Sequence, residues 1–299
     1  MTTPFVVRAS ARSVHLTRRT FLAQAALVGI PVGVPASAGQ SGASQPAKAG
    51  TPTKTRLIDT NVYVGQWPFR TFPEDLAERL TKRRVTEAWA GGFDAIFHRD
   101  LTRVNASLAA QCKGILKPVG SIHPKLPDWR DDLRRCIEQH GMKAIRLHPN
   151  YHGYTLEDPA FIELLEAATA QKLLIQIVAQ MEDERTQHPL VQVKPVDFKP
   201  LPALLKKIPE ARVMVLNANR AMSMTALAGA NVWLDIAMLE GVGGIENLLK
   251  DWPLDRLVFG SYAPVFYWES ARLKLQESEL SEQQITAITH GNASGMIGA

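Results

Sequence analysis

Short apolar segments recur at regular intervals along this chain, and this repetition constrains the fold more than any other feature. The segments are Leu57–Val62, Thr86–Gly91, Leu116–Ile122, Ala144–Leu147, Leu173–Val178, Arg212–Leu216, Asn231–Ile236 and Arg256–Gly260. The first five begin about thirty residues apart, which is the length of one strand–helix unit. Continuous apolar runs are typical of parallel strands that are buried on both faces. The pattern predicts an α/β protein with eight strand–helix units, a (β/α)8 TIM barrel, in preference to an open doubly wound sheet.

Helical periodicity fills most of the intervals between these segments. Two apolar stripes follow the spacing of one helix face: Leu101, Val104, Leu108 and Cys112, and Phe161, Leu164, Leu165 and Ala168. Ser281 followed by Gln284 predicts a capping box at the start of a last helix. Residues 56–299 have the length of one TIM barrel, so we expect a single folded domain.

The first 55 residues have the composition of an export leader and a linker. Arg18-Arg19 precede Phe21-Leu22 and an apolar stretch, and Ala36-Ser37-Ala38 supplies a small-x-small cleavage pattern. We predict a cleavable twin-arginine signal peptide over 1–38 and a disordered linker over 39–55; an ordinary amphipathic N-terminus is the alternative. The apolar stretch is too short and too interrupted for a stable membrane anchor. We therefore expect the twin-arginine machinery to export the folded protein to the periplasm or beyond the cell.

Charge and cysteine content exclude some classes of partner. The formal net charge is +5, but four of the arginines lie in residues 1–38, which contain no acid. The rest of the chain has 30 basic and 29 acidic residues, so nucleic acid is not an expected partner. Cys112 and Cys136 lack the spacing of a metal site. We expect two buried free thiols, with a disulfide after export as the alternative.

Polar residues lie on or at the end of several predicted strands, where a TIM barrel places its chemistry. They are Asn61, Arg146, His148, Gln176, Asn217, Asp235 and Ser261. A buried polar group without a partner costs about 1–3 kcal/mol, so these residues predict either a mutually bonded cluster or a pocket for a small polar molecule. Asp235, between apolar neighbours, is the best candidate for a raised pKa, whereas a partner such as Arg146 would lower it.

Two loops add polar groups to the same end of the predicted barrel. The segment 148–154 combines histidines with Asn150 and Tyr151, which could bond the hydroxyls of a ligand. The segment 181–189 holds Glu182 and His188 close together, which is a candidate acid–base set. For segment 148–154 the alternative is a loop packed by its own aromatic side chains. For segment 181–189 the alternative is a set of charges exposed to solvent.

Four short motifs, taken in order, resemble those of a known superfamily. They are Ile58-Asp59, Arg146-Leu147-His148-Pro149, Phe259-Gly260-Ser261 with Pro264, and Gly291-Asn292-Ala293. Their order and spacing over residues 57–299 resemble the amidohydrolase superfamily, in its amidohydrolase-related branch. The resemblance implies a TIM barrel that holds one or two divalent ions, which lower the pKa of a bound water for hydrolysis.

The same resemblance implies where the metal ligands of the family would lie. The two first-strand histidine positions are occupied by Asn61 and Tyr63, and the fifth- and sixth-strand positions by Gln176 and Asn217. Tyr262 stands at the eighth-strand aspartate position. Amides and phenols are poor zinc ligands, so we expect no metal cofactor; zinc or manganese is expected only if the ligands lie elsewhere.

Three functions follow from these patterns. The first is a hydrolase of amidohydrolase descent that works without the family metal on a small ester, lactone, amide or sugar acid. In it His148 or His188 is the general base, Arg146 binds a carbonyl or carboxylate, and Asp235 or Glu182 assists. The second is a non-catalytic protein that binds a saccharide-like ligand; in either case the binding residues are Asn61, Asn150, Tyr151, Gln176, Asn217 and Ser261. The third is a conventional metal-dependent hydrolase or decarboxylase.

Overall fold

The computed structural model describes residues 56–297. The predicted signal peptide, linker and cleavage site lie outside these residues. Within them, no helix combines the length and the apolar character that a membrane crossing requires.

Parallel strands form the centre of the described fold. They are β1 Ile58–Val64, β2 Glu87–Gly92, β3 Leu116–Pro118, β4 Gly120–Ser121, β5 Ala144–Leu147, β6 Leu174–Val178, β7 Arg212–Leu216, β8 Val232–Asp235 and β9 Leu257–Val258. Each lies within or next to one of the predicted apolar segments. The third segment contains both β3 and β4, which are interrupted at Val119. One sheet has the order β1-β2-β3 and the other has the order β4 to β9, and all pairs are parallel.

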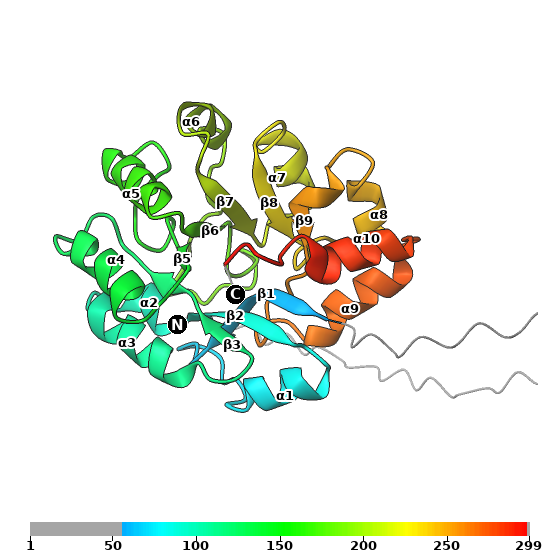
Figure 1. The fold of residues 1–299 in the computed structure, drawn as a ribbon, viewed down its shortest axis with the longest axis horizontal. Coiled ribbons are helices and arrows are strands. Elements are labelled where there is room, and N and C mark those ends of the chain that lie inside the picture. Colours follow the sequence, from blue (N-terminus) through cyan, green and yellow to red (C-terminus); the bar gives the residue numbers. More distant parts are fainter. Residues whose placement is uncertain (1–55, 298–299) are drawn as a thin grey trace, which may run out of the picture. The chain divides into compact units, whose positions relative to one another are not determined.

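Backbone hydrogen bonds join the two sheets into a closed barrel. The amide of Val119 donates to the carbonyl of Ala90 at 2.9 Å, which continues the pairing from β2 across the interruption. At the other seam the amide of Thr60 donates to Phe259 at 3.0 Å, and Val62 forms a parallel bridge with Ala263. Since β3 and β4 belong to one interrupted strand, the arrangement is an eight-stranded TIM barrel. Figure 1 shows the strands within a ring of helices.

The alternation of side chains along each strand separates two cores. On β6, Ile175 and Ile177 pack outward against the helices, whereas Leu174 and Val178 belong to a second cluster inside the barrel. Gln176 lies between Ile175 and Ile177 and is fully buried. Because side chains alternate along a strand, the side chain of Gln176 points into the barrel.

Helices cover the outside of the strands. They are α1 Leu76–Lys82, α2 Asp94–Phe97, α3 Leu101–Gln111, α4 Trp129–Glu138, α5 Pro159–Ala170, α6 Leu201–Lys207, α7 Arg220–Thr225, α8 Gly244–Leu248, α9 Trp268–Glu277 and α10 Glu282–Thr286, with short turns η1 Leu254–Arg256 and η2 Ala287–Gly291. The predicted stripes on α3 and α5 are buried, and the capping box at Ser281 is present. Cys112 and Cys136 are buried and free, which confirms the expected thiols.

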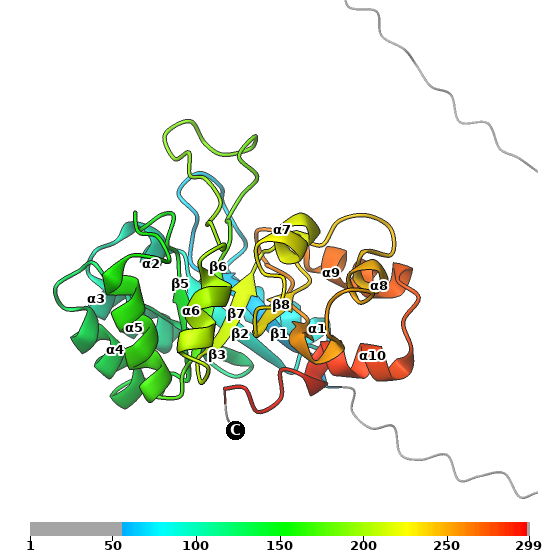
Figure 2. The ribbon, with the colours of Figure 1, turned by 90° about the horizontal axis from the view of Figure 1, so that it is seen from above.

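Two long segments rise beside each other at the carboxyl ends of the strands, as Figure 2 shows. One connects β1 to α1 and the other connects β6 to α6. His188 in the second segment stacks on Phe69 in the first, with ring centroids 4.2 Å apart and planes 8° apart. This contact links the tips of the two segments above the barrel mouth.

Candidate functional site at the barrel mouth

A buried guanidinium group occupies the interior of the barrel. Arg146, on β5, is 0% exposed and donates Nε to Gln176 Oε1 at 2.8 Å. Its Nη1 donates to the carbonyl of Val62 at 2.8 Å, and its Nη2 donates to that of Trp89 at 3.1 Å. The guanidinium also lies 4.6 Å from the ring centroid of Tyr63, a cation–π contact. Arg146 therefore connects three barrel strands, β1, β2 and β6.

A second buried set consists of two amides and a carboxyl. Asn61 Nδ2 donates to Asn217 Oδ1 at 2.8 Å and to Asp235 Oδ2 at 2.6 Å. The backbone amide of Asn217 donates to Asp235 Oδ1 at 3.0 Å, and its side chain donates to the carbonyl of Gln180 at 2.9 Å. These residues come from β1, from β8 and from the end of β7, so the closure of the barrel brings them together.

Two carboxyl groups in this region have raised pKa values. Burial raises the pKa of Asp235 to about 6, against the lowering effect of its hydrogen bonds from Asn61 and Asn217. Burial also raises the pKa of Asp59 to about 7, although Asp59 Oδ1 accepts the amide of Ser261 at 2.9 Å. The raised pKa predicted for Asp235 is confirmed, and its partners are amides rather than Arg146.

His148 is enclosed beneath a cover of aromatic side chains. Its Nε2 lies 3.0 Å from the hydroxyl of Tyr63, its Nδ1 has no partner within residues 56–297, and it is 1% exposed. Burial, and then the charges of His152 and Arg146, hold the pKa of His148 well below its usual value. Tyr63 stacks on Phe93 at 4.9 Å and meets the edge of Tyr262 at 5.7 Å. The hydroxyl of Tyr262 donates to the carbonyl of Met181 at 2.6 Å, which fixes the cover to the β6–α6 segment.

This cover separates the barrel interior from solvent. Tyr63, Phe93 and Tyr262 are 0% exposed, and Trp67 and Phe72 are 5% exposed. Six of the interior polar residues predicted as catalytic or binding groups are buried and bonded to one another or to the backbone: Asn61, Arg146, Gln176, Asn217, Asp235 and Ser261. His148 is also buried, and its Nε2 contacts the hydroxyl of Tyr63. Of the two alternatives in the sequence, the structure forms the mutually bonded cluster.

A cavity of about 710 Å³ lies among the connecting segments at the carboxyl ends of the strands. Its walls come from the segments that follow β1, β6, β7, β8 and β9, and they include Arg70, Glu182, Asn219 and Glu240. Burial raises the pKa of Glu182, and the charge of Arg70 opposes this shift. Within residues 56–297 neither Arg70 nor Glu182 has an oppositely charged partner within 4.0 Å. A half-buried acid and an unpaired guanidinium thus border the same cavity.

The structure places the other predicted residues at separate points around the mouth. His188 stacks on Phe69 and accepts the amide of Leu190 at 3.2 Å, so it positions the loop tips. Asn150 Nδ2 donates to the carbonyl of Lys194 at 3.0 Å. Tyr151 packs edge to face on Trp67, and its hydroxyl is buried without a partner in the described part of the chain. The two alternative bases therefore lie in different places, His148 against the Tyr63 hydroxyl and His188 against the Phe69 ring.

The sequence of this chain matches a known protein family over most of the barrel. A profile for the family described as Amidohydrolase matches residues 66–298. The chain belongs to the amidohydrolase family. This match confirms the predicted membership. No curated protein matches the chain at a significant level.

Solved structures share the fold of this chain at low sequence identity. A 2,6-dihydroxybenzoate decarboxylase from Rhizobium is 11% identical with a TM-score of 0.63, over 81% of this chain and 98% of the other. A 5-carboxyvanillate decarboxylase from Novosphingobium aromaticivorans, solved with bound manganese, is 12% identical with a TM-score of 0.62, over 81% and 96%. A 4-oxalomesaconate hydratase from Rhodopseudomonas palustris is 14% identical with a TM-score of 0.60, over 81% and 95%. These likenesses confirm the TIM-barrel fold.

The residues at the positions implied for metal ligands do not fit a divalent ion. The amides of Asn61, Gln176 and Asn217 are held in hydrogen bonds with other residues of the barrel interior. Tyr63 and Tyr262 present phenols, and burial raises the pKa of Tyr63 to about 12, which disfavours the phenolate that a metal would need. The guanidinium of Arg146, bonded directly to Gln176, would repel a second cation. In residues 56–297 no three His, Cys, Asp or Glu side chains are grouped so as to hold a metal.

Two features of the site were missed at the level of sequence. Asp59 was noted only as part of a motif, although its position two residues before Asn61 on the same strand would have indicated a second interior carboxyl. Arg70 lies in the connection after β1, and nothing in the sequence distinguishes it from other loop arginines. Its importance comes from the cavity that it borders.

Proposed function

We propose that this protein is an exported amidohydrolase-family hydrolase that acts on a small polar substrate in the cavity above the barrel mouth, without a metal in the barrel interior. The substrate class is an ester, lactone, amide or sugar-derived acid. The observation that carries the proposal is the placement of Glu182 and Arg70 on the wall of the same 710 Å³ cavity. Among the described residues neither side chain has a salt-bridge partner within 4.0 Å. A cavity of this size accommodates a small molecule.

The two side chains have complementary chemistry. A carboxylate whose pKa is raised by burial is a stronger general base than an ordinary glutamate, because its affinity for a proton is higher. The guanidinium of Arg70 is a donor for a substrate carbonyl or carboxylate and stabilises negative charge that develops on oxygen. In this assignment Glu182 deprotonates water and Arg70 holds the oxygen of the reacting group.

The interior residues support this site without contacting the substrate. The Tyr262 hydroxyl bonds the carbonyl of Met181, the residue before Glu182, and therefore fixes the backbone of the proposed base. The aromatic cover forms the floor of the mouth, and Arg146 holds Tyr63 in that cover from below. His148 and Asp235 are thereby structural residues rather than the acid and base of the reaction.

The test uses a panel of p-nitrophenyl esters, aryl amides and sugar lactones with the purified protein. For any substrate that is turned over, Glu182→Gln should reduce kcat by about 100-fold or more, the usual contribution of a general base. Glu157→Gln, an exposed glutamate outside the cavity wall, is the matched control and should leave kcat unchanged. Full activity in Glu182→Gln would refute this assignment.

The metal content of the protein provides a second test. After expression with added zinc and manganese and purification without chelator, we expect less than about a tenth of an equivalent of metal, and no change in Tm with EDTA. Near-stoichiometric metal, removable with loss of Tm, would overturn the metal-free part of the proposal.

A second candidate function is ligand binding without turnover. It is favoured by one observation, the complete enclosure of the barrel interior that the family uses for chemistry. It predicts that a ligand, such as a saccharide, raises the Tm progressively as its concentration increases and is recovered unchanged. Product formation that depends on Glu182 would exclude it.

A further inference from the structure

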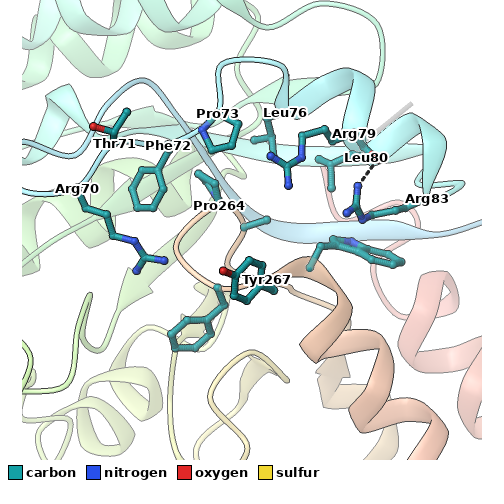
Figure 3. A pocket seen from close by; sticks show the side chains of 13 residues that line it. Arg70, Thr71, Phe72, Pro73, Leu76, Arg79, Leu80, Arg83, Pro264 and Tyr267 are labelled. Atoms are coloured by element: carbon teal, nitrogen blue, oxygen red, sulfur yellow. Dashed lines mark hydrogen bonds between the residues drawn. The ribbon is translucent and has the colours of Figure 1, made fainter.

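A separate cavity of about 430 Å³ lies at the seam where the barrel closes. One wall is the β1–α1 segment with helix α1, and the other is the segment that leads from β9 into α9. Figure 3 shows the side chains of Arg70 and Arg79 extending from the first wall toward Pro264 and Tyr267 of the second. Glu182 does not line this cavity, so it is distinct from the proposed hydrolytic site, although Arg70 borders both.

The charges in this cavity are all of one sign. Arg70, Arg79 and Arg83 line it, and its lining contains no aspartate or glutamate. Arg83 is neutralised by an ion pair with Glu269, which lies outside the lining. Among residues 56–297 no carboxylate lies within 4.0 Å of Arg70 or Arg79. Two guanidinium groups that line one concave site and have no salt-bridge partner among the described residues favour an anion there.

The rest of the lining is flat and apolar. Phe72, Phe266, Tyr267 and Trp268 contribute aromatic rings. Tyr267 is 78% exposed, which is unusual for a large aromatic side chain and leaves its ring available for contact. The guanidinium of Arg70 lies 5.0 Å from the ring centroid of Phe72, so part of its orientation is fixed before any ligand binds.

We propose that this cavity binds a small organic anion with a flat apolar body. The carboxylate of the ligand lies between Arg70 and Arg79, and its body packs against Phe266 and Tyr267. The volume, the unpaired positive charges and the aromatic surface each select one part of this ligand: its size, its anionic group and its ring. The proposal is independent of the hydrolytic assignment because it requires neither Glu182 nor turnover.

The test measures binding of benzoate to the purified protein by calorimetry, with benzyl alcohol as the uncharged analogue of the same shape. A ligand of this size should saturate the site with a Kd of roughly 1–10 mM. Arg79→Gln should weaken benzoate binding about fivefold to tenfold, through loss of a charge-assisted hydrogen bond. Lys82→Gln, on the same helix but outside the cavity, is the matched control and should bind as the wild type does. Tyr267→Ser should weaken benzoate but not inorganic phosphate.

The outcomes separate this proposal from the proposed function. Benzoate binding that is retained in Glu182→Gln and weakened in Arg79→Gln supports the anion site whatever the fate of the hydrolase assay. Each variant is first checked for a wild-type Tm, so that a folding defect is not counted as lost binding. The absence of saturable benzoate binding overturns the proposal. Equal binding of benzyl alcohol, or wild-type binding by folded Arg79→Gln, also overturns it.

Discussion

The buried carboxyl of Asp59 should make the stability of this protein depend on pH. In the folded state burial raises its pKa from 3.8 to about 7. Between these values the folded protein holds one proton more than the unfolded chain, so stability falls as pH rises, by about 1.4 kcal/mol per pH unit. From pH 5 to pH 7 the free energy of unfolding should therefore decrease by about 2 kcal/mol on account of this residue. The decrease ends at about pH 8, where the carboxyl is ionised in both states.

Asp59→Asn removes the ionisation with little change in shape. The amide oxygen can still accept the backbone amides of Ser261 and Asn61, which now lie 2.9 and 3.3 Å from Asp59 Oδ1. We expect the variant to lose about 3 kcal/mol of the pH dependence between pH 5 and 8. It should be more stable than the wild type at pH 8. Asp235, with its pKa raised to about 6, accounts for a residual decrease of about 1 kcal/mol between pH 5 and 6.

Urea unfolding at pH 5, 6, 7 and 8 measures this effect in the wild type, in Asp59→Asn and in a control variant. The control is Asp128→Asn, an exposed carboxyl at the start of α4, which should retain the wild-type pH dependence. If Asp59→Asn shows the same decrease from pH 5 to 8 as the wild type, Asp59 is ionised in the folded state throughout, and the reasoning from burial is wrong.

Three further predictions concern the packing of the barrel. Arg146→Met should lower the free energy of unfolding by about 3 kcal/mol or more, because it leaves the carbonyls of Val62 and Trp89 buried without donors; a loss below about 1 kcal/mol in urea unfolding would contradict the role given to Arg146. Gly260→Ala should cost about 1–3 kcal/mol, since its Cβ would lie 2.8 Å from that of Asp235, whereas the control Gly92→Ala would meet no atom closer than 3.8 Å. Neither Cys112 nor Cys136 should react with a thiol reagent in the folded protein, because burial raises their pKa values to about 11 and 12; rapid labelling without denaturant would refute this.

The predicted strand positions were correct because burial on both faces leaves a direct signature in the sequence. The segment Leu174–Val178 consists of apolar residues except for Gln176, and the helix that precedes it carries its buried stripe at helical spacing. Single polar residues within these apolar strands also indicated which side chains face the interior. Successive side chains of a strand point to opposite faces, so each polar residue is assigned to one face. The interruption at Val119 and the exact strand lengths depend on pairing with neighbours and were not predicted.

The pairing of the polar residues could not be predicted in the same way. Asn61 and Asp235 are 174 residues apart, and only closure of the barrel brings their side chains to 2.6 Å. The sequence therefore left open whether these groups bind each other or a ligand. The assignment of His148 as a base is affected by the same problem, since its burial beneath Tyr63 depends on rings supplied by several connecting segments.

The sequence by itself determined the eight-unit barrel, the family and the set of polar residues that face inward, because each of these follows from local periodicity or from short motifs. The tertiary structure alone decided which groups are accessible. Hydrogen-bond partners and solvent exposure depend on distances between segments far apart in the chain, and those distances are set by barrel closure and by the two segments that rise over its mouth.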